Sequence, residues 1–302
     1  MLNHHRWPIL FLLFLITANT ALAQDDDDVV RVNTELVVIN VTVTDAAGNY
    51  VRALRLSDFK VFEDGKEVDP KSIVGFALQE SPYASVVLID SSGSMEQRMI
   101  LARSGAIRFL DGLRDEDVAA VYRFDSKVQR VQNFSGGRDL APLAYGIRAK
   151  GMTTLNDAIV EAAQALAKRP EQRKAIVVLS DGADTFSKAS SSKAIESALE
   201  VGASIYAVDM SSIEVGGSGR RQSAGSLKEF AEKTGGRFIT TPGGPELRDA
   251  FRGIAEELGQ QYTLAYRPLN RARDGKWRTL EVRVQKPDLQ VRSRKGYRAP
   301  KN

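Results

Sequence analysis

The sequence predicts an α/β protein with a doubly wound, mostly parallel sheet covered by helices on both faces, and a small antiparallel β module built from the two ends of the chain. In the middle of the chain, short apolar runs alternate with helical patterns, which is typical of parallel strands buried between helices. Toward both ends, apolar residues recur at every second position, which is typical of half-buried antiparallel strands. The chain has 302 residues, 43% of them hydrophobic, which is enough for one large core and a second small one.

Residues 1–23 have the pattern of a secretory signal peptide. A short positive region at residues 4–6 precedes an apolar stretch at residues 9–16, and Ala21-Leu22-Ala23 has the small-x-small pattern of a cleavage site. The apolar stretch is too short to span a membrane comfortably, and the acidic run Asp25–Asp28 follows it at once. We therefore expect cleavage rather than an uncleaved anchor, export to the periplasm or the extracellular space, and a solvated acidic tail.

Cleavage would leave a chain without His or Cys, because His4 and His5 lie in the signal sequence. Ser-His-Asp and Cys-His nucleophilic sites, His/Cys zinc sites and disulfides all need these residues. The composition therefore excludes those classes of chemistry and predicts a fold that is held together by its core.

Residues 24–80 predict the N-terminal half of the β module. Apolar and polar residues alternate over 37–44, and further strands are expected at 50–54 and 59–62. The sequence Glu63-Asp64-Gly65-Lys66 is typical of a hairpin turn.

Residues 81–260 predict the α/β domain. Strands are expected at 86–89, 118–124, 175–179, 203–208 and 237–240, and helices at 99–113, 155–168, 192–201, 227–233 and 245–258. Thr154 is in position to cap the second helix. The Gly- and Ser-rich stretch 216–225 predicts a surface loop.

Residues 261–302 predict three more antiparallel strands, at 262–266, 280–284 and 289–294. Residues 267–302 carry twelve Lys/Arg against three Asp/Glu, a net charge of +9, whereas residues 24–80 carry six against twelve, a net charge of −6. Because neither segment is large enough to be stable alone, we expect the two to pair into one module. The alternative is that the basic residues merely occupy solvated strand faces.

The candidate site lies where the apolar strand 86–89 ends, at Asp90. Ser92 and Ser94 follow in a turn of small residues, and in open α/β sheets ligands bind outside the carboxyl ends of the strands. Thr153 and Asp181 stand at the starts of neighbouring loops. Hydroxyl and carboxylate oxygens are hard donors, so this group of residues indicates a metal site.

Together these residues resemble the von Willebrand factor A family and its metal-ion-dependent adhesion site. The family pattern is Asp-x-Ser-x-Ser, then a loop Thr, then an Asp that ends a later strand. Its members here are Asp90, Ser92, Ser94, Thr153 and Asp181. Thr154 is the less favoured alternative to Thr153 as the threonine of this pattern. The two serines could instead belong to a turn that caps the following helix. The resemblance covers residues 84–260.

The flanks resemble a narrower group of exported bacterial proteins, the VWFA-related domain proteins. The resemblance rests on residues 41–45 with Gly48, on 56–65, and on 262–266 through 294–297. It covers nearly all of the chain after the signal sequence. This group implies an architecture and no particular biochemical role.

The donor set favours Mg²⁺ or Mn²⁺ over Zn²⁺. The resemblance implies that an Asp or Glu of a protein partner completes the metal shell, with no catalytic residues and no nucleic acid involved. Two alternatives stay open: a structural envelope or assembly subunit, and a metal-dependent hydrolase with Asp184 or Glu96 as its base. Asp157, Asp184 and Asp209 are otherwise interpreted as caps or solvated surface residues.

Overall fold

The computed structural model describes residues 36–77, 81–211, 218–240 and 244–301, so the predicted signal peptide and Asp25–Asp28 lie outside the described residues. The strands are β1 (Val37–Thr44), β2 (Phe59–Glu63), β3 (Lys66–Glu67), β4 (Ile73–Ala77), β5 (Tyr83–Asp90), β6 (Val118–Phe124), β7 (Val128–Ser135), β8 (Arg173–Ser180), β9 (Ala203–Asp209), β10 (Phe238–Thr240), β11 (Tyr262–Tyr266), β12 (Trp277–Val284), β13 (Gln290–Arg292) and β14 (Gly296–Arg298). The helices are α1 (Met99–Asp111), α2 (Pro142–Tyr145), α3 (Leu155–Ala167), α4 (Ser191–Glu200), α5 (Ser218–Thr234) and α6 (Gly244–Gln260).

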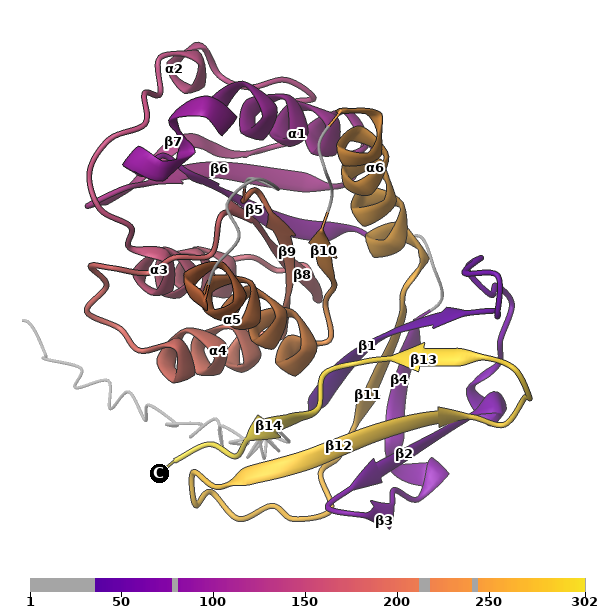
Figure 1. Cartoon of the computed structure of the whole chain (residues 1–302). Helices are drawn as coiled ribbons and strands as arrows, with labels where there is room; N and C mark the ends of the chain where they lie inside the picture. The colour runs from indigo at the N-terminus through magenta and orange to yellow at the C-terminus, as the bar shows by residue number, and fades with distance from the viewer. Residues whose placement is uncertain (1–35, 78–80, 212–217, 241–243, 302) are drawn as a thin grey trace, which may run out of the picture. The chain divides into compact units, whose positions relative to one another are not determined.

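A six-stranded sheet in the order β10-β9-β8-β5-β6-β7 forms the centre of the α/β domain (Figure 1). All neighbouring strands in it are parallel except β6 and β7, which are antiparallel. Every residue of β5 is buried, because β6 and β8 flank this strand and helices cover both of its faces. The predicted doubly wound sheet is confirmed.

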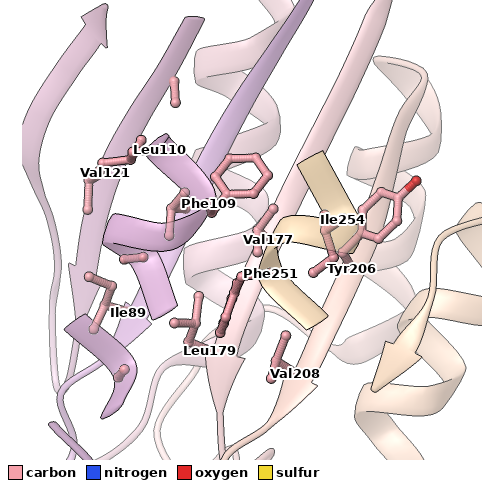
Figure 2. Packing of buried hydrophobic residues seen from close by; sticks show 14 of the residues in the cluster. Ile89, Phe109, Leu110, Val121, Val177, Leu179, Tyr206, Val208, Phe251 and Ile254 are labelled. Carbon is pink, nitrogen blue, oxygen red and sulfur yellow. The ribbon is translucent and has the colours of Figure 1, made fainter. Parts of the chain in front are cut away.

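The helices lie in two layers, with α1 and α6 on one face of the sheet and α3, α4 and α5 on the other (Figure 1). On the first face, Phe109 and Leu110 of α1 pack with Phe251 and Ile254 of α6 over the central strands (Figure 2). On the second face, the apolar side of α3 packs on the opposite side chains of β5 and β8. No helix in the described part of the chain is long and apolar enough to cross a membrane.

The two ends of the chain build one β module with its own apolar core. One sheet has the order β13-β1-β11-β4 and the other β14-β12-β2-β3, so in both sheets strands from before the α/β domain pair with strands from after it. The predicted pairing of the terminal segments is therefore confirmed. A buried ion pair connects the module to the domain: Glu257 of α6 lies 2.5 Å from Arg292 of β13 and accepts a hydrogen bond from Tyr206.

The prediction of a strand at residues 50–54 is wrong. Only an isolated bridge between Tyr50 and Thr44 forms there, and Ala53 has a positive φ of 61° that interrupts an extended ladder. The hydroxyl of Tyr262 takes the place of a strand partner, because it accepts from the Leu54 N–H and donates to the Val51 carbonyl.

Two local predictions on the α/β domain are also corrected, and one of its strands is absent from the prediction. Residues 218–225, expected as loop, belong to α5, whose good helix formers Arg220, Arg221 and Gln222 outweigh the scattered glycines. Thr154 precedes α3 but does not cap it, because its hydroxyl donates to the Asp125 carbonyl. The edge strand β7 was not predicted, since its polar sequence lacks a clear apolar period.

Two glycines in the packed helices test the core directly. Replacing Gly105 by alanine should destabilise the protein by about 1–3 kcal/mol, because the new Cβ would overlap the buried ring of Phe251. Replacing Gly253 by alanine should be neutral or stabilise by up to about 1 kcal/mol, because its Cβ would enter open space on a helix. Urea unfolding of both variants measures the difference, and equal effects would contradict this account of the α1–α6 packing.

Candidate metal site

The parallel register of the central strands brings the first site residues together. β5 and β8 pair in register up to Ile89 and Leu179, so Asp90 and Ser180 follow side by side at the same sheet edge. The Ser180 hydroxyl donates to Asp90 Oδ2 at 2.5 Å. Its own oxygen accepts from the Gly182 N–H at 3.0 Å, which fixes the start of the Asp181 loop.

The turn after β5 gathers the two predicted serines around Asp90. The Ser92 N–H donates to Asp90 Oδ1 at 2.8 Å, and the hydroxyl oxygens of Ser92 and Ser94 lie 3.1 Å apart. Ser91 anchors the turn, because both its N–H and its hydroxyl donate to the Phe124 carbonyl on β6. The side chain of Ser92 does not cap the 3₁₀ turn Gly93–Arg98. The capping interpretation of Ser92 is therefore not supported.

The loop before α3 lies against this turn and carries Thr153. The Lys150 N–H donates to the Ser91 carbonyl at 2.8 Å, and the Gly93 N–H donates to the Gly151 carbonyl at 3.2 Å. Thr153 is 3% exposed, and among the described residues its hydroxyl forms no hydrogen bond. The hydroxyl of Thr154 is engaged by Asp125, as described above, so the geometry favours Thr153 as the available donor.

Asp181 is half-buried and its Oδ1 accepts from the Ala183 N–H at 3.3 Å. Its charge acts on Asp90, where it contributes to a raised pKa. Burial is the main reason that the pKa of Asp90 rises to about 6, while hydrogen bonds from Ser180 and Ser92 oppose this rise. Within the described part of the chain, no Lys or Arg forms an ion pair with either carboxylate.

A fully buried carboxylate beside a second one is costly unless a cation compensates it. Two carboxylates and three hydroxyls provide hard oxygen donors of the kind that Mg²⁺ and Mn²⁺ prefer. No group of three or more His, Cys, Asp or Glu that could hold a metal occurs among the described residues. The donor set here differs from such a group, because hydroxyls form more than half of it.

The remaining acidic residues near the loops have structural partners. Asp157 accepts from the N–H groups of Lys188 and Ala189, and Asp184 accepts from those of Asn156 and Ser187. These bonds join the start of α3 to the loop after β8. Asp209 accepts from both the N–H and the hydroxyl of Ser211, whereas Glu96 is exposed.

Ser180 was not predicted as part of the site. Its signal is the parallel register: a residue that ends β8 opposite the end of β5 must lie beside Asp90. The sequence Ser180-Asp181 therefore supplies one residue that holds the buried carboxylate and one that adds a second carboxylate.

Comparison with known proteins gives a family match within the α/β domain. Residues 85–183 match the von Willebrand factor type A domain family, and this stretch contains all five predicted site residues. The matched stretch covers about a third of the chain and lies within the α/β domain. No curated protein sequence matches the chain significantly.

Solved structures agree on the fold. The chain is similar to a von Willebrand factor type A protein from Catenulispora acidiphila, with 15% identity over 81% of this chain and 74% of that one, at a TM-score of 0.50. Weaker matches at a TM-score of 0.47 are protein BatB from Bacteroides thetaiotaomicron, with 20% identity over 58% of this chain and 98% of that one, and the D319A mutant of the PilB minor pilin from Streptococcus sanguinis, with 16% identity over 64% of each chain.

The hydrogen bond between Ser180 and Asp90 makes a testable contribution to stability. Replacing Ser180 by alanine should cost about 1–3 kcal/mol, because a buried carboxylate oxygen loses its donor. Replacing the exposed Ser104 of α1 by alanine is the matched control and should change the free energy of unfolding by less than about 0.5 kcal/mol. Chemical denaturation of the metal-free chain measures both, and equal values would show that Ser180 does not support Asp90.

Proposed function

We propose that this chain is an exported, metal-dependent protein-binding module of the adhesion type. The observation that carries the proposal is the Asp90 carboxylate, which is fully buried, is held by Ser180 and Ser92, and has no cationic partner among the described residues. A divalent cation is the natural compensation for such a group.

Five residues would hold Mg²⁺ or Mn²⁺: Asp90, Ser92, Ser94, Thr153 and Asp181. A bound ion would supply an open coordination position for a carboxylate oxygen from an Asp or Glu of a protein partner. Ser180 orients Asp90, and the hydroxyls of Ser92 and Ser94 lie beside each other in the turn that follows it. Ser94 is exposed, so this side of the site is accessible to a partner.

The non-enzymatic part of the proposal rests on the residues around the site. Hydrolysis would need a general base near the metal. Both carboxylate oxygens of Asp184 already accept hydrogen bonds from Asn156 and Ser187, and the exposed Glu96 carboxylate forms no hydrogen bond or ion pair with a described residue. Neither residue has the surroundings of a tuned catalytic group.

Metal binding by the purified chain is the first test. Calorimetry should detect Mg²⁺ or Mn²⁺ binding to the wild-type chain and none to the double variant Asp90→Ala with Ser92→Ala, because a buried carboxylate and one hydroxyl are removed. Circular dichroism of the variant checks that it folds. Equal affinity in the two proteins would refute the metal site.

A matched pair of isosteric variants tests whether Thr153 or Thr154 is the metal ligand. Thr153→Val should weaken metal binding by at least about tenfold. Thr154→Val should lower stability through the lost bond to Asp125 and leave metal affinity within about twofold. The reverse pattern would assign the site to Thr154.

The adhesion function is tested by pull-downs from envelope extracts. We expect a set of proteins that the wild-type chain retains in Mg²⁺ and releases in EDTA, and that the Asp90→Ala, Ser92→Ala variant does not retain. If the same proteins bind with EDTA and to the variant, the chain is better described as a structural subunit. Phosphoester turnover that disappears in the variant would instead indicate a hydrolase.

A further inference from the structure

A basic pocket lies beside the candidate metal site. It has a volume of about 900 Å³ and lies between the edge strand β7 and the segment 142–150. The cationic residues in its lining are Arg123, Arg130, Arg148 and Lys150. No carboxylate is among the described residues that line it, whereas Val131 and Ile147 give it an apolar part. The pocket is therefore suited to a ligand that carries several negative charges.

The strand register places this pocket at the same end of the sheet as the metal site, where β5 and β6 end and β7 begins. Arg123 pairs with Ile89, which directly precedes Asp90. The backbone of Lys150 is bonded to Ser91, and Thr153 follows three residues later. A ligand that reaches from the Asp90 turn at the end of β5 to the β7 wall of the pocket therefore spans two strand spacings, about 10 Å.

Two of the four cations lack partners. In the described part of the chain, neither the Arg148 guanidinium nor the Lys150 ammonium forms a hydrogen bond or ion pair, and both residues are exposed. Arg123 is partly neutralised, because it lies 3.1 Å from Asp125. The positive charge that is free to act on a ligand therefore comes mainly from the 148–150 side of the pocket.

The other wall of the pocket is an unpaired sheet edge. β7 is the last strand of its sheet, and no hydrogen bond joins its backbone to any described residue outside β6. The pairing at Val128–Arg130 is regular, and the first register shift follows at Val131, which also lines the pocket. Gln132 bonds Ala141 and Asp139 and so holds the segment of the opposite wall beside the strand.

Open strand edges accept extended peptides through backbone hydrogen bonds. From this edge and these cations we propose that the pocket between β7 and segment 142–150 binds an extended acidic segment of a protein partner, independently of metal. If the proposed function holds, it is the same partner whose carboxylate reaches the metal, so that two weak contacts act as one tight one. A polyphosphate would use the cations alone and would gain nothing from the β7 backbone.

Fluorescence anisotropy with a labelled decaglutamate peptide tests the proposal in EDTA. The full-length chain should bind this peptide and bind decaglutamine at least tenfold more weakly. The variant Arg148→Glu with Lys150→Glu should bind decaglutamate at least fivefold more weakly. The control variant Arg271→Glu with Lys276→Glu changes the net charge equally at exposed positions and should stay within twofold of wild type.

A decaglutamate peptide with N-methyl groups at alternate residues tests the strand edge and should bind more weakly than the unmodified peptide. The proposal is overturned if the two charge variants lose affinity equally, if N-methylation has no effect, or if polyphosphate of matched charge binds more tightly than the peptide. The metal site is tested separately, because Asp90→Ala with Ser92→Ala should retain decaglutamate binding and the pocket variant should retain Mg²⁺ binding.

Discussion

The burial of one carboxylate at the end of a central parallel strand is the constraint on which the site depends. Asp90 terminates a strand that is buried along its whole length, and it is held there by a hydroxyl from β8 and a backbone N–H from its own turn. Ser91 fixes this turn by donating to the Phe124 carbonyl of β6, and the Lys150 N–H fixes it by donating to the Ser91 carbonyl. Three neighbouring elements therefore converge on a buried carboxylate that no cationic side chain of the described residues pairs with, and removing such a group from water is costly.

The β module gives this domain a second point of attachment for the chain ends. In each of its sheets, strands from before the α/β domain pair with strands from after it, so each complete sheet needs both ends of the chain. The ion pair between Glu257 and Arg292 joins the module to α6, which packs against α1, the helix that follows the Asp90 turn. The module and the site are thus parts of one packed unit that is formed without disulfides.

Strong periodic patterns predicted most of the fold. Strands such as β5 and β8 are continuous apolar runs, and α3 has a clear apolar face, so their sequences allow few alternatives. The failures occur where tertiary contacts override local pattern. Residues 50–54 are held by hydrogen bonds to the hydroxyl of Tyr262, which lies more than 200 residues later in the sequence. β7 is a polar edge strand that forms because β6 provides a partner for its backbone.

Motif and strand order were enough to select the candidate site residues, because the carboxyl ends of parallel strands meet at one edge. Ser180 and the basic pocket could not be predicted from the motif, because they depend on the strand register and on the segment that lies beside β7.

The most direct measurement for the central claim is anomalous diffraction from crystals of the chain soaked in Mn²⁺. We predict a single strong anomalous peak within bonding distance of Asp90, Ser92 and Ser94. A map with no peak there, in crystals that leave the turn accessible, would contradict the metal site.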